Sequence, residues 1–293
     1  MIEFFIGVDG GGSGTRVRLA RADGVEIAEG AGGPSGLMHG IAKAWAAVEE
    51  AATQAFDAAA LDFPDKSTIA IGLGLAGVHN RQWAAEFVAA NPGYAQVALE
   101  SDGHTTVLGA HQGQPGAIIA LGTGSVGEIK LADGRHVEVG GWGFPAGDEA
   151  SGAWMGLRAI NHVQQVLDGR MPANAFATDV ANACGANQAE PRNAIQNWLA
   201  RATQTHYAQL ARIVLLHGDS NDTARAILQA AGREVELMAH ALDASATLPI
   251  ALCGGLAAPM RPYLPSSMSQ RVVAPHGDSA AGALRLIQTR FKE

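Results

Sequence analysis

Two glycine-rich turns in this sequence carry residue types that suit phosphate binding. The first turn runs from Asp9 through Gly10, Gly11, Gly12, Ser13 and Gly14 to Thr15, and the second is Gly122-Thr123-Gly124-Ser125. Such turns expose backbone N–H groups with no side chain in the way, which is how proteins hold phosphate oxygens. Each turn lies between two short strands, and an Asp-Gly turn with a third strand follows. This repetition predicts duplicated lobes that grip a nucleotide from both sides.

The residues after the first turn exclude two common phosphate-binding designs. A dinucleotide-binding turn opens a helix, and a P-loop needs Gly-Lys-Ser/Thr before its helix. Here Arg16 and Arg18 alternate with Val17 and Leu19, which is the pattern of a half-buried strand. The unit is therefore a β-hairpin with phosphates at its bend. A tight hairpin without a ligand is the alternative for one such turn, and the second turn weighs against it.

Composition and charge limit the possible partners. The chain has 293 residues, of which 47% are hydrophobic, so it can form two domains of ordinary size. A net charge of −8 with no basic run argues against nucleic acid and against an anionic membrane surface. Cys184 and Cys253 show neither disulfide nor metal spacing. We expect a cytoplasmic protein with no nucleic-acid or membrane partner.

Strands and helices are expected to alternate along the chain. Strands are predicted at 4–8, 16–19, 25–28, 68–73, 97–99, 117–121, 128–131, 136–139 and 249–253. Helices are predicted at 36–60, 80–90, 105–112, 149–167, 192–202, 206–216 and 222–244, with a last one from about 278. The turn-forming stretch Gly113-Gln114-Pro115-Gly116 predicts a boundary between domains 1–114 and 115–293. The pattern indicates the α/β class.

Two aspartates next to predicted helices have both chemical and structural interpretations. Asp102 follows a strand, and ligands of open α/β sheets gather at the carboxyl ends of strands. It could equally form a turn with Gly103 or cap the helix that starts near Thr105. Asp148 precedes the helix at 149–167, where capping could account for it or accompany a ligand contact. His104 is expected to be a solvated histidine at a helix start.

The motifs together resemble the sugar kinase, Hsp70 and actin superfamily, and within it the hexosamine kinase branch of the BadF/BadG/BcrA/BcrD ATPase family. The resemblance covers nearly the whole chain. It rests on phosphate motifs at 6–13 and 121–125, connecting motifs at 72–77 and 277–283, and an adenosine motif at 253–255. It implies a two-lobe actin-like ATPase (ribonuclease H-like) fold with duplicated mixed β-sheet domains flanked by helices. The final helix, from about 278, is expected to pack back on the first lobe.

The implied reaction is transfer of the γ-phosphoryl group of MgATP to the 6-hydroxyl of N-acetylglucosamine, a small amino sugar. Positioning and charge neutralisation carry most of the catalysis in such reactions. Asp9 would anchor Mg²⁺ through water, although it could simply start a turn, and Asp102 would take the hydroxyl proton. ATP would be held by Gly11, Gly12, Ser13, Gly14, Thr15, Thr123, Gly124, Gly254 and Gly255.

The loop at 140–143, followed by 147–149, is similar to the sugar-contacting loop of hexosamine kinases. Trp142 is flanked by Gly140, Gly141 and Gly143, so it is poorly placed as a core residue and well placed to lie against a sugar ring. The resemblance implies sugar contacts from Ser35, Asp102, Gly141, Trp142 and Asp148.

Glucosamine is the alternative substrate. Its ammonium group calls for a carboxylate, whereas the neutral pair Trp142-Gly143 favours the acetamide. The asparagine of the animal-type N-acetylglucosamine kinases has no clear equivalent at 33–36, where only Ser35 could substitute.

A dehydratase-activator ATPase is the alternative of a different class. It needs cysteine thiolates for an iron–sulfur cluster, and Cys184 and Cys253 are poorly placed in the sequence for one. Members of the family are often dimers, so a homodimer is an expectation.

Overall fold

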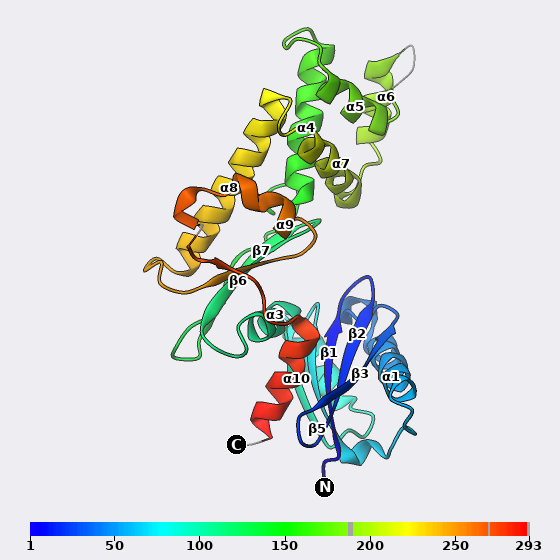
Figure 1. Cartoon of the computed structure of the whole chain (residues 1–293). Coiled ribbons are helices and arrows are strands. Elements are labelled where there is room, and N and C mark those ends of the chain that lie inside the picture. Colours follow the sequence, from blue (N-terminus) through cyan, green and yellow to red (C-terminus); the bar gives the residue numbers. More distant parts are fainter. Residues whose placement is uncertain (187–189, 269, 292–293) are drawn as a thin grey trace. The chain divides into compact units, whose positions relative to one another are not determined.

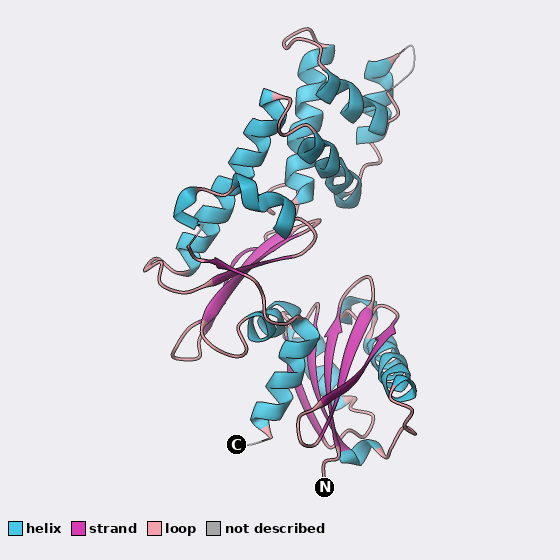
Figure 2. Cartoon of the chain, viewed as in Figure 1, coloured by secondary structure: helices cyan, strands magenta, loops and turns pink. Residues whose placement is uncertain are grey.

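The chain forms two compact units, each built around a five-stranded sheet (Figures 1 and 2). The structure, a computed structural model, describes residues 1–186, 190–268 and 270–291. Within this part of the chain we find no helix that is both long enough and apolar enough to cross a membrane. Two sheets flanked by helices confirm the expected α/β class with duplicated lobes.

The units differ from the expected domains 1–114 and 115–293 chiefly in two segments, 129–136 and 274–293, which both belong with the first unit. The first unit comprises Met1–Gly116, Ile129–His136 and Ala274–Glu293, and the second comprises Ala117–Glu128 and Val137–Val273. The expected division at 114 and 115 therefore missed that 129–136 belongs with the first unit. Contacts over a long sequence separation explain this: Lys130 Nζ donates a hydrogen bond of 2.9 Å to the carbonyl oxygen of Gly113.

The sheet of the first unit has the strand order β3-β2-β1-β4-β5. β1 is antiparallel to β2 and parallel to β4, β2 is antiparallel to β3, and β4 is parallel to β5. Asp9 pairs with Gly74, and Gly74 pairs with Glu100. The ends of three neighbouring parallel strands therefore meet at one edge. The strands are β1 Phe4–Gly10, β2 Thr15–Arg21, β3 Glu26–Gly32, β4 Ile69–Leu75 and β5 Gln96–Glu100.

Helices cover both faces of this sheet (Figure 1). On one face α1 (Ile41–Ala58) packs against β2 and β3 over a core that includes Phe56 and Trp45. α10 (Ser279–Arg290) packs against β1 and β4 and beside α3 (Asp102–Ala110). A Cβ atom at Gly72 would overlap the carbonyl oxygen of Ala283, so glycine is what permits this close approach. The remaining helix is α2 (Arg81–Ala89).

The sheet of the second unit has the order β10-β9-β6-β7-β8, with β9 parallel to both β6 and β10. Met238 and Leu242 of α8 lie against Gly140 and Gly127, so α8 covers β7 and β8. α4 packs against α5, α7 and α8. The strands are β6 Gly116–Leu121, β7 Ser125–Lys130, β8 His136–Gly140, β9 Ile250–Cys253 and β10 Val272–Val273. The helices are α4 Gly152–Leu167, α5 Ala175–Ala183, α6 Pro191–Leu199, α7 Gln204–Leu216, α8 Asp222–Leu242 and α9 Ala257–Met260.

Every predicted strand and helix exists, but several helix starts were wrong. The first helix starts at Ile41 and not at 36, because Leu37–His39 forms a 3₁₀ turn and Gly40 follows with a φ of +99°. The helix expected near Thr105 starts at Asp102. Helices α5 and α9 and the short strand β10 were not predicted.

Candidate active site

The first glycine turn is an open loop at the end of the β1–β2 hairpin. Gly10 pairs with Thr15, and the N–H of Gly11 donates a 3.1 Å hydrogen bond to the carbonyl oxygen of Gly14. Gly12 and Ser13 are exposed, and no described atom lies within 4 Å of where a Cβ of Gly11 would be. Exposed backbone N–H groups at such a bend can hold phosphate oxygens.

Thr15 and Ser35 support this loop from inside. Both are buried, and Thr15 Oγ1 lies 2.6 Å from the carbonyl oxygen of Gly33 and 2.7 Å from Ser35 Oγ. The N–H of Ser35 also donates to the carbonyl oxygen of Gly11, at 3.2 Å. The two hydroxyls therefore hold the loop together. Thr15 was expected to contact phosphate and Ser35 to contact the sugar, but in this conformation neither hydroxyl is exposed.

Asp9 precedes the loop and is held on one side by an arginine. Arg16 Nη2 and Nε donate to Asp9 Oδ2 at 2.6 and 3.1 Å, whereas Oδ1 accepts no hydrogen bond from the described residues. Those residues also contain no group of three or more histidine, cysteine or acidic side chains that could enclose a metal ion. A single available carboxylate oxygen fits Mg²⁺, which usually keeps several waters and binds substrate phosphates.

Asp102 is the first residue of α3, directly beyond the end of β5. It does not cap the helix, because Ser101 is the N-cap and its hydroxyl accepts a 3.0 Å hydrogen bond from the N–H of His104. The capping alternative for Asp102 is therefore wrong. Its Oδ1 accepts from the N–H of Gly103 at 3.1 Å. Within the first unit, Asp102 thus follows the sheet edge at which Asp9 and Glu100 are in register through Gly74.

His104 is not the solvated histidine that the sequence suggested. Its ring is half-buried and packs against the ring of His136, with 4.5 Å between the centroids. Burial, and then the nearby charges of His136, Lys130 and Arg290, lower the pKa of His104 to about 4. A neutral imidazole therefore stands two residues after Asp102 at neutral pH.

The second glycine turn is tied to the start of α4. The N–H groups of Gly152 and Ala153 donate to the carbonyl oxygens of Gly122 and Thr123, at 2.8 and 3.2 Å. Gly122 N–H donates to the carbonyl oxygen of Gly124 at 2.9 Å, and Thr123 is exposed. The turn therefore has a defined conformation with its tip open to solvent.

Asp148 lies against this second turn. Its Oδ2 is 2.8 Å from where a Cβ of Gly124 would be, and it accepts a 2.6 Å hydrogen bond from Gln204 Nε2. The cap of α4 is Ser151, whose Oγ accepts from the N–H of Trp154 at 3.1 Å, so the capping interpretation of Asp148 is wrong. The sequence offered no signal for Gln204, which lies 56 residues away.

Trp142 lies in an exposed position within a glycine-rich loop. Gly140, Gly141 and Gly143 all have positive φ, and Trp142 is 86% exposed, so it does not fill a core. Glu138 Oε1 lies 3.3 Å from where a Cβ of Gly141 would be. A carboxylate therefore lies beside this loop, and no pattern in the sequence indicated it.

A cavity of about 590 Å³ lies beside the proposed adenosine motif. Gly254 and Gly255 follow β9 and are exposed, and Gly255 lines the cavity. This volume is ordinary for a small-molecule site, and most of the wall is apolar. The other lining residues are Leu256, Pro259 and, from α7, Ala208, Gln209, Ala211, Arg212 and Leu215.

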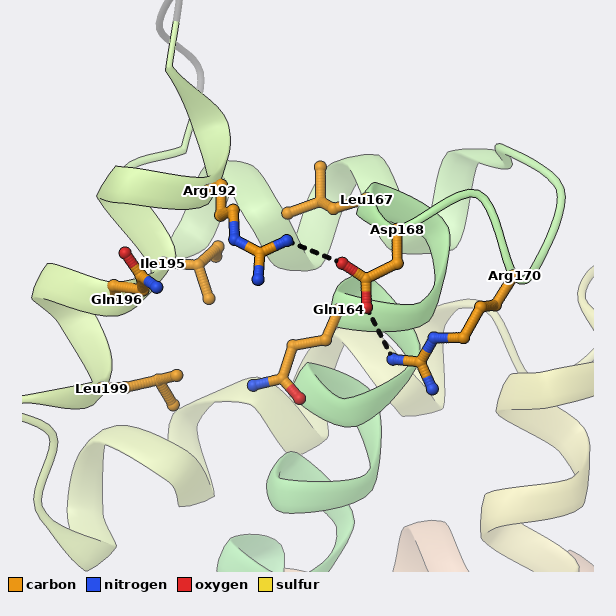
Figure 3. A pocket seen from close by; sticks show the side chains of 8 residues that line it. All are labelled: Gln164, Leu167, Asp168, Arg170, Arg192, Ile195, Gln196 and Leu199. Atoms are coloured by element: carbon orange, nitrogen blue, oxygen red, sulfur yellow. Dashed lines mark hydrogen bonds and ion pairs between the residues drawn. The ribbon is translucent and has the colours of Figure 1, made fainter.

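A second cavity, of about 260 Å³, lies at the end of α4 and contains none of the predicted site residues (Figure 3). Arg170 and Arg192 donate to opposite oxygens of Asp168, at 2.8 and 2.9 Å. Asp168 is the C-cap of α4, where a negative charge is unfavourable. Neutralisation of this carboxylate accounts for both arginines.

Both cysteines are free thiols in apolar surroundings. Burial raises the pKa of Cys184 to about 12 and that of Cys253 to about 11. Both side chains are therefore uncharged, weakly nucleophilic thiols at neutral pH.

The predicted site residues divide between the two units. Asp9, the turn at 11–14 and Asp102 belong to the first unit. Thr123, Gly124, the loop at 141–148, Gly254 and Gly255 belong to the second.

Residues 6–284 match the BadF/BadG/BcrA/BcrD ATPase family. The glucosamine kinase of Vibrio cholerae is 32% identical over 285 residues, covering 97% of this chain and 95% of that protein. A crystal structure of a proposed N-acetylglucosamine kinase from Chromobacterium violaceum is 50% identical, covers 98% of this chain and 99% of its own, and has a TM-score of 0.89. The ROK hexokinase of Thermus thermophilus has a TM-score of 0.58 at 16% identity, covers 98% of each chain and shares the fold.

Proposed function

Because the chain belongs to the BadF/BadG/BcrA/BcrD ATPase family, we propose that it is an ATP-dependent hexosamine kinase that phosphorylates the 6-hydroxyl of N-acetylglucosamine. The relatives from Vibrio cholerae and Chromobacterium violaceum are both named for amino sugars, which supports this class of substrate. A homodimer and a cytoplasmic location stay predictions.

One observation carries the proposed chemistry. Asp102 follows a strand end in the unit that also holds Asp9 and the open Gly11–Gly14 turn, while Ser101 performs the helix capping. The Asp102 carboxylate is therefore not required as the N-cap of α3. This favours a role as general base, because a carboxylate at a strand end can accept a proton from a bound hydroxyl.

In the proposed reaction Asp102 accepts the proton of the 6-hydroxyl as its oxygen forms a bond to the γ-phosphorus, and the bond to ADP breaks. The turns at 11–14 and 122–124 would hold the phosphates, and Asp9 would hold magnesium-bound water. Magnesium, when bound, neutralises the phosphate charge. The cavity beside Gly255 would take the nucleoside, and Trp142 with Asp148 would contact the sugar.

Glucosamine is a second candidate substrate because of Glu138. Its carboxylate lies beside Gly141, next to the exposed Trp142, and could pair with an ammonium group. The neutral pair Trp142-Gly143 favours the acetamide instead. The named activity of the Vibrio cholerae relative adds weight to the unacetylated sugar.

A substrate panel tests the proposal. ATP would be supplied with N-acetylglucosamine, glucosamine, N-acetylmannosamine or glucose, and kcat/KM would be measured from ADP release. We expect the highest value for N-acetylglucosamine. A higher value for glucosamine would transfer the assignment to that sugar, and no phosphorylation of either amino sugar would refute the kinase proposal. In that case iron analysis after anaerobic reconstitution would test the dehydratase-activator alternative.

A further inference from the structure

Two arginines on β2 hold carboxylates that come from different elements. Arg16 donates to Asp9, at the end of β1, with N···O distances of 2.6 and 3.1 Å. Arg18 donates to both oxygens of Asp278, with distances of 3.0 and 3.2 Å. Asp278 is the N-cap of α10, and its Oδ1 accepts from the N–H of Ala281 at 2.9 Å. The two pairs therefore join β2 to a strand end in one case and to a helix start in the other.

The Asp9–Arg16 pair leaves one carboxylate oxygen available. The two residues are directly opposite in the register of β1 and β2, at the base of the Gly11–Gly14 turn. Both donor nitrogens of Arg16 go to Oδ2, and Oδ1 accepts no hydrogen bond from the part of the chain that the structure describes. A guanidinium is charged at any pH at which proteins fold, so the contact is a charge-assisted pair.

Fold stability is a weak explanation for this pair. The Arg16 side chain is 64% exposed, and exposed ion pairs contribute little to the free energy of unfolding. Orientation of Asp9 is a stronger explanation for the pair. A carboxylate that acts through metal-bound water needs a fixed direction, and hydrogen-bond partners outside the metal's own ligands hold it in that direction.

We propose that Arg16 is the positioning residue of Asp9: it fixes the carboxylate through Oδ2 and leaves Oδ1 for magnesium-bound water. This inference rests on the proposed function, in which Asp9 anchors Mg²⁺. It predicts that Arg16 strengthens the contribution of Mg²⁺ to nucleotide binding and has little effect on nucleotide binding without metal.

Arg18 provides a matched control. It is on the same strand as Arg16, two residues further on, and therefore on the same face of the sheet. Its partners are Asp278, Glu26 and Glu29, so its role is to attach α10 and β3 to β2. Replacing Arg18 removes an arginine from the same surface without touching Asp9.

The test is calorimetric titration of the full chain with a non-hydrolysable ATP analogue, in excess Mg²⁺ and in EDTA. The ratio of the two dissociation constants measures the gain from the metal. We expect Arg16→Ala to lower this gain about tenfold, which is typical when an outer partner of a metal ligand is lost. Arg16→Lys should retain part of it and Arg18→Ala all of it. In an Asp9→Asn background, Arg16→Ala should cause no further loss.

Other outcomes would overturn the inference. If Arg16→Ala weakened nucleotide binding equally in Mg²⁺ and in EDTA, Arg16 would be a direct phosphate ligand. If the gain in affinity from the metal were unchanged or larger in Arg16→Ala, Arg16 would not position Asp9. If Mg²⁺ did not increase the affinity of the wild type for the nucleotide, Asp9 would not anchor the metal and the inference would fail. A wild type that binds MgATP with a metal gain but phosphorylates no amino sugar would refute the kinase proposal and leave the role of Arg16 intact.

Discussion

Asp102→Asn separates catalysis from helix stability at the start of α3. Asparagine keeps the size of the side chain, and its Oδ1 can still accept the 3.1 Å hydrogen bond from the N–H of Gly103. The negative charge in the first turn of α3 is lost, and such a charge stabilises a helix by about 0.3–1 kcal/mol. We therefore expect the free energy of unfolding to fall by less than about 1 kcal/mol.

The expected effect of Asp102→Asn on turnover is much larger. General base catalysis contributes about 10²–10⁴-fold, so kcat should fall by that factor, which corresponds to roughly 2.7–5.5 kcal/mol in the barrier. The assay is ADP release at saturating MgATP and N-acetylglucosamine, with nucleotide binding measured separately by calorimetry. Binding should stay close to that of the wild type.

Ser101→Ala is the matched control for Asp102→Asn. It removes the true N-cap of α3 and should cost about 1 kcal/mol of stability, with kcat changed only slightly. If Asp102→Asn turned over sugar within about threefold of the wild-type rate, or lost activity only together with its fold, Asp102 would not be the base.

Three further predictions test other parts of the two units. Trp142→Ala should change the free energy of unfolding by less than about 0.5 kcal/mol, because the side chain is 86% exposed. It should raise KM for N-acetylglucosamine and so lower kcat/KM, which corresponds to a loss of about 1–3 kcal/mol in transition-state binding. An unchanged KM for the sugar would show that Trp142 is not in the site. Gly124→Ala should displace Asp148, whose Oδ2 is 2.8 Å from the new Cβ, and lower the free energy of unfolding in urea by about 1–3 kcal/mol. In Gly11→Ala the new Cβ would have no such close contact among the described residues, so this control should lose little stability. Equal losses in the two variants would contradict this geometry. Because the pKa of His104 is lowered, its contribution to the free energy of unfolding is complete above about pH 6.5 and is lost as the pH falls towards about 4. His104→Gln should therefore reduce the acid-induced loss of stability by roughly 1–2 kcal/mol. Parallel plots of the free energy of unfolding against pH for wild type and variant would refute this prediction.

Local sequence patterns predicted the elements of this protein well. The alternation from Arg16 to Leu19 predicted a strand after the first glycine turn and so a hairpin with the turn at its bend, and the structure confirms this hairpin as β1 and β2. Such patterns work because a strand or helix places its side chains by its own period, whatever lies elsewhere in the chain. Helix starts were less predictable, because neighbouring residues such as Ser101 and Asp102 compete for the same cap.

Contacts between distant residues could not be predicted in this way. Arg18 and Asp278 are separated by 260 residues, and Gln204 reaches Asp148 over 56. The burial of the Ser35 hydroxyl against Thr15 likewise depends on how the loop after β3 folds over the first turn. The periodic pattern of apolar residues along the chain does not predict which loops and helices will be in contact.

The sequence alone therefore determined the two glycine turns, the strands around them and the resemblance to sugar kinases, since each depends on residues that are close together in the chain. Only the tertiary structure decided which residues cap the two helices that Asp102 and Asp148 could have capped. Asp102 and Asp148 are ordinary cap residues by type, and the choice went to Ser101 and Ser151. The physical reason is that a cap depends on the backbone conformation at one residue, which the packing of the whole helix determines.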